Sequence, residues 1–463
     1  MRSPWLLLPL LALATGCWTR LGQPDAFEAG SRWEPPVHLA ASATPPPAAE
    51  QALPDVLDLD AAVRIALEEN PSLRTAFMRV EAAKARLTSS WTVYSPVIDG
   101  VALYSKTFQV PRQRSVPGIN QETEFYRYGL RGTWLLFDGL AREYRVRAAE
   151  FGVTESKAVH DDARRLLRQA VEAAYFAALG AVEGVRIAEA DLAFEKELLD
   201  ETAKRHRAGD RSLSDKLNFE VRVRTAESNL IAVQSRLRTL RVALAELLGI
   251  ENGRLPERVQ VDILEVETEE DLAEPVADAL VREALENRPD LGGAVAAADR
   301  RRAEVGATDS GWWPALALVG EIGRERFGNA HFRSEDTASS VSLQATWNLF
   351  SGGSRLAAHR EAVANQRAAE AELAQVRNQV ISEVRQAVEA VLAAQQQVVT
   401  QREKVKLTRE TRDLVRKEYD AGHESLVRLN EVQRDFVVAE ARLASERVAL
   451  RTARSGLRTA VGR

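Results

Sequence analysis

Charged, hydroxyl and glycine residues gather in two stretches of the sequence, RHRAGDRSLSD (205–215) and EYDAGHESLVR (418–428). Their side chains can form hydrogen bonds and cap helices. The six histidines of the chain form no HExxH or similar cluster, and the sequence contains no glycine-rich phosphate loop. The sole cysteine, Cys17, excludes a disulfide framework and a CxxC metal site. We therefore expect no enzyme, no metal site and no cofactor.

Both stretches carry the signals of a turn between two helices. We expect Gly209 and Gly422 each to end a helix, because a left-handed residue is needed there and glycine has no Cβ penalty. Ser212 can cap the next helix, and Asp215 three residues later completes an S-x-x-D capping box. The second stretch keeps the serine, Ser425, but has an arginine in place of the acid. The second cap should therefore be weaker.

The cysteine follows MRSPWLLLPLLALATG, in which a charged start and an apolar run precede small residues. This order predicts a secretory signal peptide over residues 1–16, which is too short for a membrane span. The small residues before the lone Cys17 resemble a bacterial lipobox, in which the cysteine becomes the lipidated first residue, although the usual leucine is displaced by one position. Because Trp18 stands where inner-membrane lipoproteins carry aspartate, the outer membrane is favoured. An ordinary signal peptide with an incidental cysteine is the alternative.

Composition limits the class of protein. The formal net charge of the 463 residues is −5, and the charges are mixed along the chain, so we expect no nucleic-acid partner. Charged residues make up 28% and aromatic residues 6%, which indicates long, surface-rich helices rather than one large globular core. Residues 17–53 are rich in Pro, Ala and Ser without periodicity. They are predicted to be the lipidated N-terminus and a flexible tether.

The two stretches belong to an internal duplication. At an offset of 213 residues, WLLFDG (134–139) corresponds to WNLFSG (347–352). Upstream of a loop the offset becomes 218, and Pro71 corresponds to Pro289. Chance similarity would not keep one register over such a distance. The predicted parts are a first repeat at 54–249, an equatorial linker at 250–275 and a second repeat at 276–463.

Each repeat is expected to contain the same elements in the same order. A short helix ends before the proline and a second helix follows it, at 276–288 and 290–312 in the second repeat. Next come two strand-like segments, at 97–110 with 124–136 and at 315–327 with 338–349. A long helix and a return helix complete each repeat, at 140–207 with 212–249 and at 353–420 with 425–462. At 1.5 Å per residue, each long helix spans about 100 Å.

The strand-like segments alternate in polarity. In 338–349, for example, Val341 and Leu343 face one side and Ser340 and Ser342 the other. Such segments suit the wall of a membrane β-barrel, although a half-buried antiparallel sheet of a soluble domain gives the same pattern. Four strands cannot close a barrel, and an open edge in lipid is forbidden. In a membrane, several chains would therefore have to share one barrel.

The order and repetition of these features resemble the TolC-type outer-membrane efflux family. The motifs are an AL-x-x-NP-x-L start, strands ending in W-x-L-F-x-G and an A-G-x-x-S-L turn, and the resemblance covers nearly all of residues 57–462. It implies a mainly α protein with membrane β: a homotrimer with one 12-stranded outer-membrane β-barrel continued by a periplasmic α-barrel. Docking to a periplasmic adaptor (membrane fusion) protein and an inner-membrane pump is also implied. The implied function is the passive exit duct of a tripartite efflux or type I secretion system in a Gram-negative bacterium, here of the lipid-anchored branch.

The resemblance assigns roles to the two turns. As pump-side tips, they would receive the hairpins of the adaptor at Gly209, Ser212, Leu213, Gly422, Ser425 and Leu426. Tyr419 and Asp215 lie where family members link neighbouring hairpins, and breaking such links would let the inner hairpins swing outward. Glu424 and Glu431 are candidates for a charged ring at the closed entrance, although Arg428 replaces an acid often found there. Ordinary turn residues and exposed helix charges are the alternative.

Other classes of protein remain open from the sequence. A periplasmic coiled-coil adaptor or structural lipoprotein would share the apolar stripes of the helices, but an adaptor normally has one hairpin rather than two matched ones. A passive porin would not explain about 100 Å of helix. The sequence does not identify the cargo, since Arg127 and Arg131 in one strand are too few to define a preference for anions.

Overall fold

The computed structural model describes residues 53–108, 122–209 and 212–463. The predicted signal peptide, Cys17 and all but the last residue of the predicted tether lie outside these residues. Within the described part, no helix combines the length and the apolar character that crossing a membrane requires.

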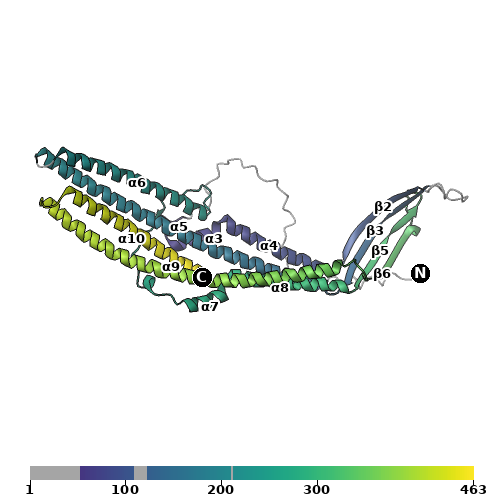
Figure 1. Cartoon of the computed structure of the whole chain (residues 1–463). Helices are drawn as coiled ribbons and strands as arrows, with labels where there is room; N and C mark the ends of the chain where they lie inside the picture. Colours follow the sequence, from purple (N-terminus) through teal and green to yellow (C-terminus); the bar gives the residue numbers. More distant parts are fainter. Residues whose placement is uncertain (1–52, 109–121, 210–211) are drawn as a thin grey trace. The chain divides into compact units, whose positions relative to one another are not determined.

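The described chain is mainly helical, and its two halves contain the same elements in the same order (Figure 1). The first half comprises α3 (Leu59–Glu69), α4 (Pro71–Thr92), β2 (Val97–Phe108), β3 (Glu122–Phe137), α5 (Ala141–Arg207) and α6 (Leu213–Leu247). The second half comprises α7 (Ala277–Asn287), α8 (Pro289–Asp309), β5 (Ala315–Phe327), β6 (Thr337–Thr346), α9 (Ser354–Asp420) and α10 (Leu426–Val461). The predicted duplicated, mainly helical fold is confirmed. The 67 residues of α5 and of α9 correspond to about 100 Å of helix each.

Two predicted boundaries in the second half are wrong. The second short helix ends at Asp309 and continues as a 3₁₀ turn (Ser310–Trp312), and β6 ends at Thr346 rather than at residue 349. The last paired residues of β5 and β6 are Ala315 and Thr346. Pro314, just before β5, has no N–H to donate, so the partner strand ends there as well.

The duplication extends to single contacts. In the first half, Asn70 precedes the proline that starts α4, and its Nδ2 donates a hydrogen bond to the carbonyl of Leu247 in α6 at 2.9 Å. In the second half, Arg288 precedes the proline that starts α8, and its Nη1 donates to the carbonyl of Ala460 in α10 at 3.3 Å. The residue before each proline therefore joins the two short helices to the end of the return helix.

The four long strands form one antiparallel sheet in the order β2-β3-β5-β6. The pair β3/β5 joins the strands of the two repeats, and Gly129 lies opposite Gly323 in this pair. Because side chains alternate between faces, the register sorts them by polarity. One face carries mostly apolar side chains, among them Ile98, Tyr104, Tyr128, Leu130, Trp134, Leu318, Ile322, Val341 and Leu343. The other face carries mostly polar ones, among them Asp99, Arg127, Arg131, Thr133, Glu321, Glu325, Ser340 and Ser342.

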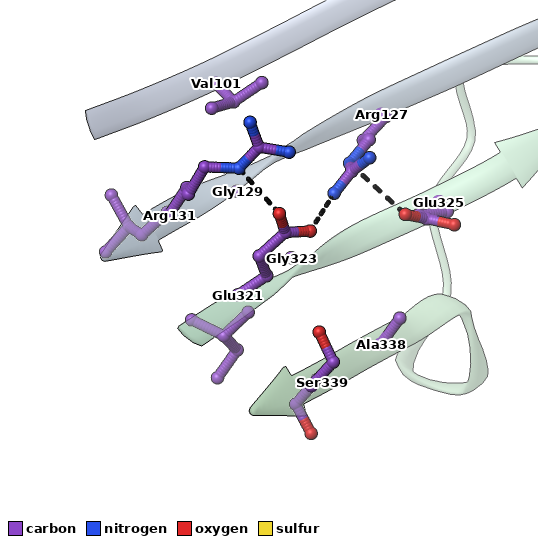
Figure 2. A pocket seen from close by; sticks show the side chains of 12 residues that line it. Val101, Arg127, Gly129, Arg131, Glu321, Gly323, Glu325, Ala338 and Ser339 are labelled. Atoms are coloured by element: carbon purple, nitrogen blue, oxygen red, sulfur yellow. Dashed lines mark hydrogen bonds and ion pairs between the residues drawn. The ribbon is translucent and has the colours of Figure 1, made fainter. Parts of the chain in front are cut away.

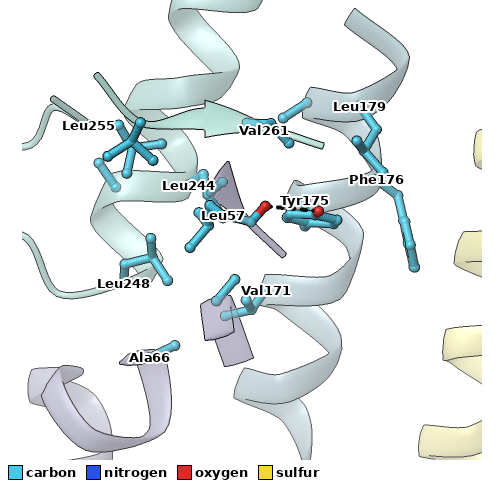
Figure 3. Packing of buried hydrophobic residues seen from close by; sticks show 14 of the residues in the cluster. Leu57, Ala66, Val171, Tyr175, Phe176, Leu179, Leu244, Leu248, Leu255 and Val261 are labelled. Carbon is cyan, nitrogen blue, oxygen red and sulfur yellow. Dashed lines mark hydrogen bonds between the residues drawn. The ribbon is translucent and has the colours of Figure 1, made fainter. Parts of the chain in front are cut away.

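The largest buried apolar cluster lies where α3, α5 and α6 meet a small parallel sheet of β1 (Val56–Leu57) and β4 (Gln260–Val261). Leu57, Val171 and Leu244 are fully buried there (Figure 3). The hydroxyl of Tyr175 donates to the carbonyl of Leu57 at 3.0 Å, and burial raises the pKa of Tyr175 to about 12. Smaller clusters follow along the long helices, so the core is distributed rather than single.

The segment 250–275 crosses α9 and α10. The Glu267 side chain is 2% exposed and lies between Arg402 of α9 at 3.1 Å and Arg447 of α10 at 2.8 Å. A few residues later, two backbone carbonyls accept hydrogen bonds from the side-chain amide of Gln395. A buried carboxylate and a series of hydrogen bonds therefore fasten this segment across the second pair of long helices.

Candidate functional site

The turn between α9 and α10 is a Schellman motif. Gly422 has a φ of +80°, and its N–H donates to the carbonyl of Tyr419 at 3.0 Å. The N–H of His423 donates to the carbonyl of Glu418 at 2.9 Å, which completes the motif. Nothing lies within 4 Å of where a Cβ on Gly422 would be placed, so backbone conformation, and not crowding, requires glycine here.

The turn between α5 and α6 has matching features. Gly209 has a φ of +88°. Ser212 accepts a hydrogen bond from the N–H of Asp215 at 3.0 Å, and Ser425 accepts one from the N–H of Arg428 at 3.2 Å. Both predicted serine caps are therefore present, and the one in the first repeat is slightly shorter.

Some of the residues predicted for adaptor docking and gating are exposed, and others are buried. Leu213 is 55% exposed, and Arg428 forms an exposed ion pair with Glu431 at 2.8 Å within α10. Tyr419 is instead 3% exposed. It packs with the apolar side chains of Leu198, Phe219, Val415, Leu429 and Val432, and Leu426 lies against the same cluster. Glu424 accepts a hydrogen bond from the N–H of the next residue, Ser425, at 3.1 Å.

A group of buried polar side chains lies beside this apolar cluster, and sequence reasoning missed it. Glu195 of α5 is 5% exposed and lies 3.4 Å from Arg222 of α6. Gln433 of α10 is 4% exposed and donates to Asp191 of α5 at 3.0 Å. One sequence signal was available for Glu195. It lies seven residues after Ala188 and seven before Thr202, both buried, so it occupies a core position of the heptad pattern.

Burial raises the pKa of the Glu195 carboxyl. The charge of Arg222 acts to lower this pKa, and the charge of Asp191 acts to raise it further. A raised carboxyl pKa means that the folded protein disfavours the charged form. The resulting cost is present at pH values above the folded pKa and disappears below the unfolded value of about 4.3.

We therefore expect Glu195→Gln to be more stable than the natural protein at pH 7, with a difference that shrinks as the pH falls towards about 4. Helix unfolding followed by circular dichroism at several pH values measures this. Glu189→Gln, which changes an exposed carboxyl of the same helix, is the control and should show no such trend. A difference between Glu195→Gln and the natural protein that is constant with pH would contradict the prediction.

The polar face of the sheet carries a ladder of four charges across β3 and β5 (Figure 2). Arg127 pairs with Glu321 and, at 3.2 Å, with Glu325, and Arg131 pairs with Glu321 at 2.6 Å. These side chains line a hollow of 220 Å³ over the glycine pair of β3 and β5. Each arginine has a carboxylate partner, so the ladder has no net charge and supports no preference for anions.

The geometry combines a four-stranded sheet with one apolar face and two pairs of long helices that end in glycine turns. The family model for outer membrane efflux proteins matches residues 62–250 and 280–463, which include both repeats. The chain belongs to the outer membrane efflux protein family.

Solved structures agree with this assignment at the level of the fold. The CmeC outer membrane channel of Campylobacter jejuni superposes with a TM-score of 0.77 at 18% identity, over 87% of this chain and 85% of that one. A membrane protein from Pseudomonas aeruginosa gives 0.76 at 21% identity, over 87% and 92%. The open state of the MtrE outer membrane channel of Neisseria gonorrhoeae gives 0.73 at 22% identity, over 87% and 88%. No curated protein sequence matches the chain.

As an outer membrane efflux protein, the chain is an outer-membrane channel of a tripartite system. Its family consists of channels and not of enzymes. The alternative of a periplasmic adaptor or structural lipoprotein is not favoured, because the efflux-protein match covers both repeats.

Proposed function

We propose that three copies of this efflux protein form one exit duct. Their β2-β3-β5-β6 sheets would close a 12-stranded barrel in the outer membrane, and their helices would continue it through the periplasm. An adaptor and an inner-membrane pump would then deliver cargo to the far end, as part of a tripartite efflux or type I secretion system.

The observation that carries this proposal is the sheet itself. Among the described residues, β2 and β6 are each paired on one side only. The face that bears Tyr128, Leu130 and Val341 leaves these apolar side chains 44%, 56% and 78% exposed. In lipid the apolar face would be covered, but the two free edges would be left with unsatisfied backbone groups unless another chain pairs with them. Barrel closure by several copies removes both edges at once.

Aromatic side chains mark the end of the sheet that adjoins the helices. The indole N–H of Trp134 donates to the carbonyl of Tyr94 at 2.9 Å, and that of Trp347 donates to the carbonyl of Trp312 at 3.2 Å. Tryptophan and tyrosine gather at membrane–water interfaces. Their position supports a membrane boundary at this end of the strands, with the helices on the periplasmic side.

The helical turns would be the pump-side tips. Gly209, Ser212, Leu213, Gly422, Ser425 and Leu426 would receive the adaptor, and Asp215, Tyr419, Glu424, Arg428 and Glu431 would close the entrance. Leu213 is exposed, and the space beside Gly209 and Gly422 is empty in the single chain. Both features support docking of a partner helix at this end. Acylation of Cys17 would anchor the chain in the outer membrane.

The test is to purify the full-length protein from membranes in detergent. We expect a trimer by size-exclusion chromatography with light scattering, an elongated cylinder by electron microscopy, and a lipid on the N-terminal cysteine by mass spectrometry. A stable monomer or dimer would contradict the shared barrel, and an unmodified Cys17 would contradict the anchor alone.

A further inference from the structure

An unpaired arginine lies on the apolar face of the sheet. Arg324 of β5 is in register with Tyr128 of β3, and Ile322, two residues earlier, is in register with Leu130. Alternate residues of a strand share a face, so the guanidinium group of Arg324 belongs to the face that would meet lipid. Within the described ranges, Arg324 forms no hydrogen bond or ion pair with another residue.

The other basic side chains near this end of the strands already have acidic partners. Three such pairs are present: Lys106 with Glu124 at 3.6 Å, Arg326 with Asp336 at 2.9 Å, and Arg333 with Glu335 at 3.4 Å. Their charges cancel within each pair. The charge of Arg324 therefore remains available for an anionic group from outside the chain.

The apolar face is hollowed beside Arg324. A hollow of 570 Å³ is lined by Arg324, by Tyr128 and Leu130 of β3, and by small residues of β2. These small residues, Gly100 and Ala102, are in register with Leu130 and Tyr128 and leave the space free. Barrel closure would pair the outer edges of β2 and β6, so it would not cover this hollow.

The hollow lies towards the end of the sheet that is remote from the helices. β5 ends at Phe327, three residues after Arg324, and a loop leads from there to β6. On β3, Trp134 at the helical end and Glu124 are ten residues apart. This corresponds to about 26 Å of depth at a rise of about 3.4 Å per residue and a tilt of about 40°, close to the apolar band of about 25 Å in outer-membrane barrels. Arg324 would then lie in the outer half of the membrane, within reach of the headgroups.

Aromatic rings surround the outer rim of the hollow. Phe332, in the loop between β5 and β6, packs against Tyr128 with the ring centroids 4.7 Å apart. The rings of Tyr104 and Tyr126 lie 4.9 Å from each other. Aromatic side chains gather at membrane–water interfaces. Their position supports a headgroup level at this rim, directly above the hollow.

We infer that this hollow binds a phosphorylated lipid of the outer leaflet, namely the acylated glycolipid that covers the exterior of Gram-negative outer membranes. An acyl chain would lie in the hollow against Leu130 and Ile322. The guanidinium group of Arg324 would donate two parallel hydrogen bonds to a phosphate group. The inference rests on the proposed barrel and assigns a lipid site to its outer surface.

The test is native mass spectrometry of the full-length protein extracted from outer membranes, followed by titration with purified lipid A in detergent. We expect the natural protein to retain a phosphorylated glycolipid. Arg324→Gln should bind lipid A about tenfold more weakly, which is the scale of hydrogen bonds to one charged group. Gly100→Leu should also bind it more weakly, because its side chain would fill the hollow. No atom lies within 4 Å of where a Cβ at position 100 would be placed, so the strand can accept this change.

Arg333→Gln is the matched control. It removes an exposed arginine near the same strand ends that does not line the hollow, so its affinity for lipid A should equal that of the natural protein. Lipid A without phosphate groups should bind the natural protein as weakly as lipid A binds Arg324→Gln.

Three outcomes would overturn the lipid site alone: a retained phospholipid in place of the glycolipid, unchanged affinity in Arg324→Gln or Gly100→Leu, or displacement of lipid A by inorganic phosphate. A natural protein that is monomeric or absent from the outer membrane would overturn the proposed function and the lipid site with it.

Discussion

Replacing Arg288 by alanine is expected to lower the free energy of unfolding by about 3 kcal/mol. The residue is 5% exposed, and its Nε and Nη2 donate to the two carboxylate oxygens of Asp290 at 2.9 and 2.7 Å. Nη1 donates to Glu383 of α9 at 2.5 Å and to the carbonyl of Ala460 in α10. One side chain thus joins the α7–α8 junction to both helices of the second hairpin.

This loss is at the low end of the usual range for removing one partner of a buried ion pair. The side chains of Asp290 and Glu383 are 27% and 38% exposed, so water can hydrate both carboxylates in the variant. Denaturant unfolding in detergent, followed by circular dichroism, gives the measurement. Arg282→Ala removes an exposed arginine of α7, six residues earlier, and should change stability by less than about 0.5 kcal/mol. Equal losses in the two variants would show that the contacts of Arg288 carry no special weight.

The helix boundaries near Arg288 show how far local signals reach. A proline at position 289 predicts the end of one helix and the start of another, and the same holds at position 71, because these rules depend on neighbouring backbone atoms alone. That the preceding residue binds the end of a helix 172 residues later depends on tertiary packing. The end of β6 is a similar case, since it is set by Pro314 on the partner strand and not by its own residues.

The candidate site divides in the same way. The glycines, the serines and the helical period predicted both turns and both caps. These signals depend only on the conformation and hydrogen bonds of residues close together in the sequence. The ion pair of Arg416 with Glu197, at 2.7 Å, was not predicted, because the two residues lie 219 residues apart in the sequence and each belongs to a helix with many other charges. The duplication did not help, since Glu197 corresponds to Glu410 in the second repeat but Arg416 corresponds to Ala203 in the first. Among these buried or paired residues, only Glu195 could have been recognised from the sequence, because it is a charged residue at a core position of the heptad pattern.

Replacing Gly129 by alanine is expected to prevent correct pairing of β3 with β5. Gly129 lies opposite Gly323, and a Cβ there would overlap the carbonyl oxygen of Ile322 and lie 2.7 Å from the Cα of Gly323. The opposing strand would have to move by about an ångström, which costs roughly 1–3 kcal/mol of overpacking and weakens the neighbouring backbone hydrogen bonds. Because this pair joins the strands of the two repeats, the defect would divide the sheet in the middle.

The expected result is a large loss of folded channel in the outer-membrane fraction, measured as the band that resists unfolding in unheated gels. Gly132→Ala is the matched control in the same strand, because a Cβ at position 132 would have its nearest neighbour at 3.9 Å. Alanine is preferred to glycine in a strand by the same amount at both positions, so any difference between the variants reports the close approach of β3 and β5.

The charge ladder depends on the same approach, since Arg127 reaches Glu321 diagonally across the space that Gly129 leaves free. A Gly129→Ala protein that gives as much folded channel as Gly132→Ala would contradict the prediction. It would mean that β3 and β5 can move apart at the glycine pair without loss of folding, and that the charge ladder is enough to hold the strands of the two repeats together.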